Sequence, residues 1–282
     1  MKVAVIDIGS NSVRLMLWAD GTTLYKKVQT TRLGESVALT GRLLPEAIER
    51  SALAVKAFYE LALLEGAEKI FAFATAAVRS AVNGGDFCTR VKTLTGIEVD
   101  VVSGETEAKL GVLGALSGEE GGIIDIGGAS TELCCEQTGL FVSLDVGAVR
   151  LYDLCGDRKD KLLPIIREKI SCLCGRSAKG EFFAIGGTAT TLASVKLGLE
   201  EYDADKIHGT EITYAEVSAL SSLFFTRTKE EREKIAGMDV RRADVISGAT
   251  YLLEQIMQTL SLERVIVSER DNMEGYLIWR GI

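Results

Sequence analysis

Short apolar runs rich in β-branched residues alternate with longer amphipathic segments along the chain. From Pro45 to the residue before Gly66, apolar positions recur at steps of three and four, which predicts an amphipathic helix. Similar patterns predict further helices at 87–94, 105–116, 149–155, 160–172, 214–225, 229–236, 243–260 and the C-terminal end. Strands are predicted at 69–78, 97–102, 140–144, 182–185 and 264–267. Such alternation predicts an α/β fold, with mixed sheets covered by helices.

Two stretches of the chain repeat each other. Residues 6–15, IDIGSNSVRL, align with residues 124–133, IDIGGASTEL, and six of the ten positions are identical. Each copy predicts a strand, a tight turn and a returning strand. The repeat therefore predicts two related domains. The stretch 117–122, SGEEGG, has the composition of a linker, so we place the domains at 1–119 and 120–282.

The repeated turns carry residue types suited to phosphate. Glycine allows backbone N–H groups to approach an anion, and serine hydroxyls add donors. Asp7 and Asp125 end their strands, where a carboxylate can hold a cation or the water around it. One copy alone would indicate a hairpin whose polar residues merely cap the turn, but two copies favour a binding site. The segment Gly186-Gly187-Thr188 also opens a predicted helix, whose N-terminus would attract an anion.

Composition excludes several classes of protein. A net charge of −8 and a pI of about 5.0 argue against broad binding of duplex nucleic acid or of an anionic membrane. No apolar run approaches the roughly 18 residues of a membrane span, and the first residues do not form a targeting signal. The single histidine, His208, excludes multi-histidine metal sites, and the absence of G-x-G and of Gly-Lys excludes the Rossmann and P-loop fingerprints.

The cysteines indicate a cytoplasmic protein. Six are present without a C-x-x-C pair or a secretory context, which predicts reduced and mostly buried thiols. A metal or redox pair at Cys172 and Cys174 is the less favoured alternative, and a capping or surface role is favoured for His208. The sequence does not determine the oligomeric state, and a homodimer is compatible with it.

Six segments occur in order over nearly the whole chain: 7–12 (DIGSNS), 74–79 (ATAAVR), 103–108 (SGETEA), 125–128 (DIGG), 186–190 (GGTAT) and 242–246 (RADVI). Together they resemble the exopolyphosphatase and guanosine pentaphosphate phosphohydrolase family of the actin-like ATPase and sugar kinase superfamily. The resemblance implies two ribonuclease-H-like domains with a cleft between them. It also implies hydrolysis of a terminal phosphoanhydride, with Mg²⁺ as the usual cation.

The same resemblance implies roles for individual residues. Glu107 matches the general base that accepts a proton from the attacking water; without the resemblance it would be read as an acid placed to suit the helix dipole. Asp125 and Glu132 match metal-site carboxylates, and Asp7 is the repeat-related counterpart of Asp125. The phosphate-binding residues would be Gly9, Ser10, Asn11, Ser12, Arg79, Gly127, Gly128, Ser130, Gly187 and Thr188. A surface ion pair is the alternative for Arg79.

The chain departs from the family pattern at Ala129, Thr106, Lys109 and Met273. These positions usually hold glycine, glutamate, arginine and arginine. The leading hypothesis is a hydrolase acting on inorganic polyphosphate or guanosine pentaphosphate, with a slight preference for polyphosphate. The alternatives are a catalytically weak sensor that binds guanosine alarmones, and an ATP-dependent kinase of the same superfamily.

Overall fold

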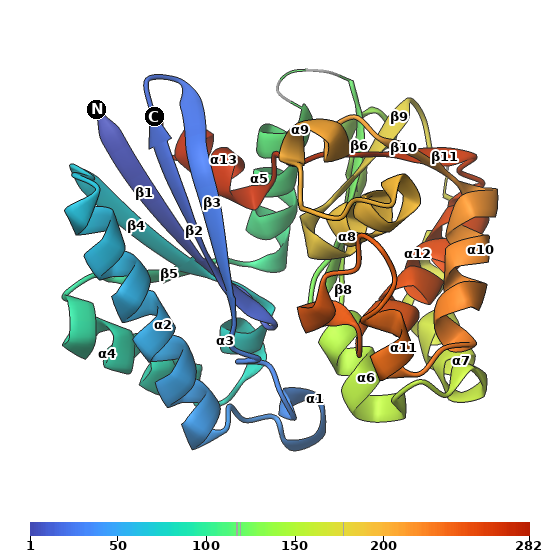
Figure 1. Cartoon of the computed structure of the whole chain (residues 1–282), viewed down its shortest axis with the longest axis horizontal. Helices are drawn as coiled ribbons and strands as arrows, with labels where there is room; N and C mark the ends of the chain where they lie inside the picture. The colour runs from blue at the N-terminus through green and yellow to red at the C-terminus, as the bar shows by residue number, and fades with distance from the viewer. Residues whose placement is uncertain (117, 119, 177) are drawn as a thin grey trace. The chain divides into compact units, whose positions relative to one another are not determined.

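The computed structural model describes residues 1–116, 118, 120–176 and 178–282. Helices and sheets alternate along the chain, so the predicted α/β class is confirmed (Figure 1). The described residues divide into two compact units. Unit 1 comprises Met1–Glu107 with Arg280–Ile282, and unit 2 comprises Ala108–Trp279. This division falls within helix α5 (Gly104–Leu116), whereas the boundary predicted near residue 119 lies outside the described residues.

Unit 1 is built on a mixed sheet. Its strands are β1 (Lys2–Ile8), β2 (Ser12–Ala19), β3 (Thr22–Thr30), β4 (Lys69–Ala74) and β5 (Val99–Val101), in the order β3-β2-β1-β4-β5. The first three strands pair antiparallel, whereas β4 is parallel to β1 and β5 to β4. The helices are α1 (Val37–Thr40), α2 (Pro45–Leu64), α3 (Ala76–Ser80) and α4 (Gly84–Thr95). Helix α2 places Ala52, Val55 and Phe58 in the apolar core of this unit.

Unit 2 repeats this topology and extends it. Its strands are β6 (Gly121–Ile126), β7 (Thr131–Cys135), β8 (Leu140–Leu144), β9 (Glu181–Ile185), β10 (Glu211–Thr213) and β11 (Arg264–Val267). Their order is β10-β11-β9-β6-β7-β8, so an antiparallel meander is again followed by parallel strands, as in ribonuclease-H-like folds. The helices are α6 (Ala148–Cys155), α7 (Lys159–Lys169), α8 (Gly186–Leu197), α9 (Ala204–Ile207), α10 (Tyr214–Phe225), α11 (Lys229–Arg232), α12 (Ile246–Leu260) and α13 (Asn272–Trp279).

Several predicted elements differ from the structure. The strand predicted at 69–78 ends at Ala74, and α3 follows it after Thr75. The helices predicted at 229–236 and 243–260 are shorter, ending at Arg232 and beginning at Ile246. Strands β3 and β10 were not predicted, because β3 is largely exposed and polar and β10 is three residues long. In the described part of the chain, no helix has the length and apolarity to cross a membrane.

Candidate active site

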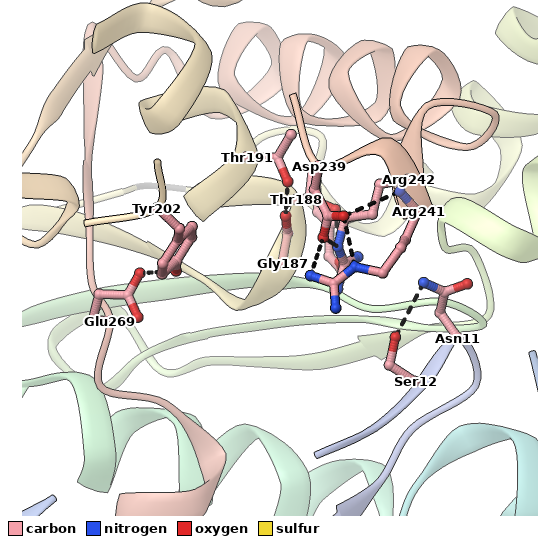
Figure 2. A network of polar contacts seen from close by, with 11 residues as sticks. Asn11, Ser12, Gly187, Thr188, Thr191, Tyr202, Asp239, Arg241, Arg242 and Glu269 are labelled. Atoms are coloured by element: carbon pink, nitrogen blue, oxygen red, sulfur yellow. Dashed lines mark hydrogen bonds and ion pairs between the residues drawn. The ribbon is translucent and has the colours of Figure 1, made fainter. Parts of the chain in front are cut away.

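The first hairpin, in unit 1, ends strand β1 at a buried aspartate. Asp7 lies opposite Arg14 in the β1–β2 register, and the Arg14 Nε donates to the Asp7 Oδ2 at 2.8 Å. The Gly9 N–H donates to the Ser12 carbonyl at 3.0 Å and closes the turn. The side chains of Ser10, Asn11 and Ser12 are buried, and the Asn11 Nδ2 donates to the Ser12 Oγ at 3.3 Å (Figure 2). The structure thus gathers the predicted residues Asp7 to Ser12 in one ordered turn.

Contacts from the following segment hold this turn from outside. The Ser10 carbonyl accepts from the Gly34 N–H at 2.8 Å, and the Asn11 carbonyl accepts from the Thr31 N–H at 3.0 Å. A Cβ at Gly34 would lie 2.8 Å from the Ser10 Cβ, so only glycine permits this approach. Because these contacts use carbonyl groups, the N–H groups of the turn other than that of Gly9 remain suited to binding an anion.

The second hairpin, in unit 2, has the same turn. The Gly127 N–H donates to the Ser130 carbonyl at 3.0 Å, and the Gly127 carbonyl accepts from the Ala148 N–H at the start of α6. The Gly128 carbonyl accepts from the Val149 N–H, and the Ala129 carbonyl accepts from the Arg150 Nε at 2.9 Å. Ala129 is not among the residues with positive φ, so the alanine in place of the usual glycine brings no left-handed backbone.

One exchange distinguishes the two hairpins. Asp125 lies opposite Glu132 in the β6–β7 register, just as Asp7 lies opposite Arg14 in β1–β2. Asp125 and Glu132 are 8% and 1% exposed. Directly opposed residues have Cβ atoms about 4.5–5.5 Å apart, so two ionised carboxylates here repel each other. Unit 2 therefore has two buried acidic side chains at the place where unit 1 has an ion pair.

Both carboxylates of unit 2 accept a hydrogen bond from a neutral side chain. The Ser143 Oγ on β8 donates to the Glu132 Oε1 at 2.7 Å, and the Asn272 Nδ2 donates to the Asp125 Oδ2 at 2.9 Å. Gly186, with φ of +77°, lies so close that a Cβ there would be 2.7 Å from the Asp125 Oδ1. Within the described residues, no three His, Cys, Asp or Glu side chains form a group that could hold a metal ion. A cation here would thus rest on two carboxylates together with oxygen atoms of its other ligands.

Helix α8 begins beside these carboxylates. The Thr188 Oγ1 donates to the Ile126 carbonyl at 3.1 Å, which ties the helix start to the hairpin, and within the helix the Thr191 Oγ1 donates to the Gly187 carbonyl at 2.7 Å. Four backbone N–H groups at a helix start lack partners within the helix and attract anions. Gly187, Thr188 and the hairpin turn are thereby brought together in unit 2.

An arginine covers the start of α8. A Cβ at Gly187 would lie 1.9 Å from the Arg242 Nη2, so the guanidinium lies directly against this glycine (Figure 2). Asp239 orients the segment: the Arg241 Nε donates to its Oδ1 at 2.7 Å, and the Arg242 Nε lies 3.7 Å from its Oδ2. Burial acts to raise the pKa of Asp239, but hydrogen bonds and charge from Arg241 and Arg242 outweigh it and leave this pKa below its usual value. Arg242 begins the segment 242–246, one of the six that carry the family resemblance, but no role was predicted for it from the sequence.

A tyrosine and a glutamate flank α8 on another side. The Tyr202 hydroxyl donates to the Glu269 Oε1, and Figure 2 shows this pair away from Arg241 and Arg242. Desolvation and the negative charge of Glu269 raise the pKa of Tyr202. The Glu269 N–H in turn donates to the His208 Nδ1 at 3.3 Å, so His208 accepts a backbone hydrogen bond.

The predicted general base is held by the predicted phosphate-binding arginine. Glu107, in the first turn of α5, is 6% exposed, and the Arg79 Nη1 donates to its Oε2 at 2.9 Å. The same nitrogen donates to the Val102 carbonyl at 2.9 Å. The Ser103 Oγ accepts from the Thr106 N–H at 3.1 Å, so Thr106 takes part in capping α5. In this structure Arg79 forms an ion pair with Glu107, and its role toward phosphate stays a prediction.

The cysteines are free thiols. Cys134, Cys135 and Cys155 are buried, and Cys172 and Cys174 are exposed. Desolvation, with smaller contributions from nearby negative charge, raises the pKa of Cys134 to about 12. A thiol with this pKa is protonated at neutral pH and serves in packing.

Comparison with known proteins places these features in a family. Residues 11–279 match the Ppx/GppA phosphatase family. Exopolyphosphatase 2 of Mycobacterium tuberculosis is 30% identical over 310 residues, which cover 97% of each chain. A bifunctional 3-dehydroquinate synthase/phosphatase of Fusobacterium nucleatum is 31% identical over 98% of this chain, and the match spans only 46% of that longer protein.

Solved structures show the same likeness. The Ppx/GppA family member of Aquifex aeolicus is 30% identical, with a TM-score of 0.78 over all of this chain and 97% of that one. An exopolyphosphatase from Cytophaga hutchinsonii is 25% identical, with a TM-score of 0.87 over 100% and 99% of the two chains. The family match covers the hairpin from Asn11 onward, Glu107, the carboxylate pair and the start of α8. The chain therefore belongs to the Ppx/GppA phosphatase family.

Proposed function

We propose that this protein hydrolyses the terminal phosphoanhydride of inorganic polyphosphate or of guanosine pentaphosphate, with Mg²⁺. Family membership and relatives named exopolyphosphatase support this function. The observation that carries it is the buried pair Asp125 and Glu132, held by neutral donors beside a glycine turn and a helix start. Two acidic side chains beside an anion-binding turn provide the ligands that a cation bound together with a phosphate group prefers.

The terminal phosphate would bind to the N–H groups of the turn 127–130 and of the start of α8. The Gly127 N–H closes this turn, and the carbonyl groups of residues 127–129 are used in contacts to α6 and to Arg150, so the remaining N–H groups of the turn are the ones suited to an anion. Arg242 adds a guanidinium at Gly187, where it can pair with phosphate oxygens. By the same reasoning, the turn 9–12 would bind a further phosphate group.

Asp125 and Glu132 have the chemistry to hold Mg²⁺, which prefers carboxylate oxygens and keeps other positions for water and phosphate. When bound, the ion would neutralise charge that develops on the phosphate oxygens. Asp7 also remains in the proposed metal set, but its ion pair with Arg14 already balances its charge. The two carboxylates of unit 2 are therefore the better candidates.

Glu107 would accept the proton of the attacking water. As the water oxygen forms its bond to the terminal phosphorus, the bond from phosphorus to the bridging oxygen breaks, and the shortened chain leaves with that oxygen. The guanidinium of Arg79, 2.9 Å from Glu107, would hold this carboxylate in place for the step. Phosphoryl transfer of this kind depends mainly on positioning and on charge stabilisation.

The test is phosphate release from medium-chain polyphosphate and from guanosine pentaphosphate, with Mg²⁺. Glu107→Gln should lower the rate by about 10²- to 10⁴-fold while substrate binding persists, because a general base contributes that much. Glu105→Gln is the matched control: Glu105 is exposed in the same first turn of α5, and its loss should leave the rate nearly unchanged. Full activity in Glu107→Gln would remove this residue from the mechanism.

The same assay separates the alternatives. Tight binding of guanosine pentaphosphate without phosphate release would indicate the sensor. ATP turnover that depends on an added acceptor would indicate the kinase. Release of phosphate from polyphosphate alone would select the polyphosphate substrate.

A further inference from the structure

A buried asparagine contacts one member of the carboxylate pair. Asn272 is 4% exposed and opens helix α13, and its Nδ2 donates to the Asp125 Oδ2 at 2.9 Å. Both residues belong to unit 2. No sequence motif assigned a role to Asn272.

The other end of this side chain is poorly satisfied. The Asn272 Oδ1 has no hydrogen-bond partner among the described residues. A Cβ at Gly111 would lie 3.1 Å from this oxygen and 2.7 Å from Ile123 Cδ1, so the oxygen faces an apolar region of α5 and β6. A buried carbonyl without a partner costs stability, and an aliphatic residue would avoid that cost. An aliphatic residue, however, could not donate the hydrogen bond that Asn272 makes to Asp125.

The start of helix α13, where Asn272 lies, is held in place by hydrogen bonds and by packing against α5. The Asp271 Oδ1 accepts from the Met273 N–H at 2.9 Å, and the Glu274 Oε2 accepts from the Asp271 N–H at 3.0 Å, which caps α13 on both sides of Asn272. Gly275 lies against α5, where a Cβ would be 1.8 Å from the Leu110 carbonyl oxygen. The Asp125 carboxylate is thus held between a rigid amide and Gly186.

The charge of the donor also matters. In unit 1 the equivalent aspartate, Asp7, receives hydrogen bonds from a cationic guanidinium, which balances its charge. In unit 2 the hydrogen bond from Asn272 to Asp125 comes instead from a neutral amide, which orients the carboxylate without adding charge of its own. We propose that Asn272 is a positioning residue that holds Asp125 in its cation-binding orientation. This inference rests on the proposed function.

The test measures Mn²⁺ binding by calorimetry, with the metal alone as the probe, and thermal unfolding of the same samples. Asn272→Leu removes the donor and also the unsatisfied oxygen. Loss of a partner that orients a metal ligand typically weakens metal binding by about 10- to 100-fold. We expect that loss together with an unchanged or raised unfolding temperature. Asn272→Ala carries the same expectation for binding and replaces Asn272→Leu should the larger residue prevent folding.

The matched control is Ser221→Ala. Ser221, on α10 in the same unit, also buries a hydroxyl without a partner among the described residues, and its removal should leave Mn²⁺ affinity unchanged. Unchanged Mn²⁺ affinity in Asn272→Leu would overturn the proposal. If that variant does not fold, unchanged Mn²⁺ affinity in Asn272→Ala would overturn it, as would a loss of affinity in Asn272→Ala that is no larger than its loss of folded protein.

A kinetic measurement adds a second readout. Asn272→Leu should raise the Mg²⁺ concentration needed for the half-maximal rate, and excess Mg²⁺ should restore much of kcat. A low kcat that excess Mg²⁺ does not restore would contradict the positioning role. If the wild type releases no phosphate from either substrate, the proposed function fails, whereas the Mn²⁺ comparison still decides the role of Asn272.

Discussion

Gly187 shows how one missing methyl group creates room for a functional side chain. The guanidinium of Arg242 occupies the space that a Cβ would take, 1.9 Å from its Nη2. The backbone of Gly187 is not in the left-handed region, and the three atoms nearest to its Cβ position all belong to this arginine. The glycine is therefore required by the close approach of Arg242 rather than by backbone conformation.

Gly187→Ala should displace Arg242 and weaken substrate binding. A hydrogen bond to a charged group contributes about 1.5–3 kcal/mol, so we expect KM for polyphosphate to rise about tenfold or more with little change in stability. Gly85→Ala is the control, because Gly85 is exposed in the first turn of α4 with nothing within 4 Å of its Cβ position. Steady-state kinetics of both variants provide the measurement, and equal KM values would contradict this account of Gly187.

Individual site residues could be predicted from the sequence where they recur in the internal repeat. The repeat located the two turns, and the structure orders each of them around the same hydrogen bond, Gly9 to Ser12 and Gly127 to Ser130. It could not identify Arg242 or Asn272, because each acts on a residue far away in the chain. Only the fold brings Arg242 to Gly187 and Asn272 to Asp125.

Helices α5 and α13 pack backbone to backbone at glycines. A Cβ at Gly114 would lie 1.9 Å from the Asp271 carbonyl oxygen, and one at Gly275 would lie 1.8 Å from that of Leu110. Neither neighbour is the flexible end of a side chain, so the helices themselves would have to separate. This contact sets the position of α13, and Asn272 lies at its start.

Gly275→Ala should therefore destabilise the protein. Overpacking of this kind typically costs about 1–3 kcal/mol, and occasionally more. Gly248→Ala is the matched control, because Gly248 is buried in α12 but its Cβ position has only ordinary contacts, at 3.6 Å and beyond. That variant should be neutral or stabilised by about 0.5–1 kcal/mol from the better helix propensity of alanine. Urea unfolding compares them, and similar losses in both would exclude a special role for the α5–α13 contact.

Elements with a clear period could be predicted from sequence, and those defined by their surroundings could not. The structure has α10 at Tyr214–Phe225 and β11 at Arg264–Val267, as predicted. Apart from Lys69 and Thr75 the stretch 69–78 is apolar, so periodicity gave no sign that β4 ends at Ala74 and α3 begins at Ala76. Strand β3 exists because β2 offers it a hydrogen-bonding edge, which no local pattern reveals.

The net charge of the whole molecule does not favour its proposed substrates, so the groups that bind them have to be concentrated at particular places. The chain carries a net charge of −8, yet its proposed substrates are polyanions. Long-range attraction therefore does not bring them to the protein. Binding has to come from the turns, the start of α8 and Arg242, where groups of suitable charge are concentrated. Composition could exclude broad anion binding, but the repeat was needed to predict the turns, and only the fold shows Arg242 at Gly187.

The exchange of Arg14 for Glu132 between the hairpins has a consequence for folding. Unit 1 places an arginine opposite its aspartate, whereas unit 2 places a second acidic residue there, so an ion bound at the pair Asp125 and Glu132 should stabilise the folded unit. Folding and ion binding are then thermodynamically linked, and a ligand at 100 times its Kd adds about 2.7 kcal/mol to the free energy of unfolding.

Mg²⁺ should raise the unfolding temperature of the wild type in calorimetry with EDTA as reference. Glu132→Gln should be more stable in EDTA and respond less to Mg²⁺, whereas an equal response in both proteins would refute the linkage. The carboxylate pair would then make the ion a part of the fold as well as of the reaction.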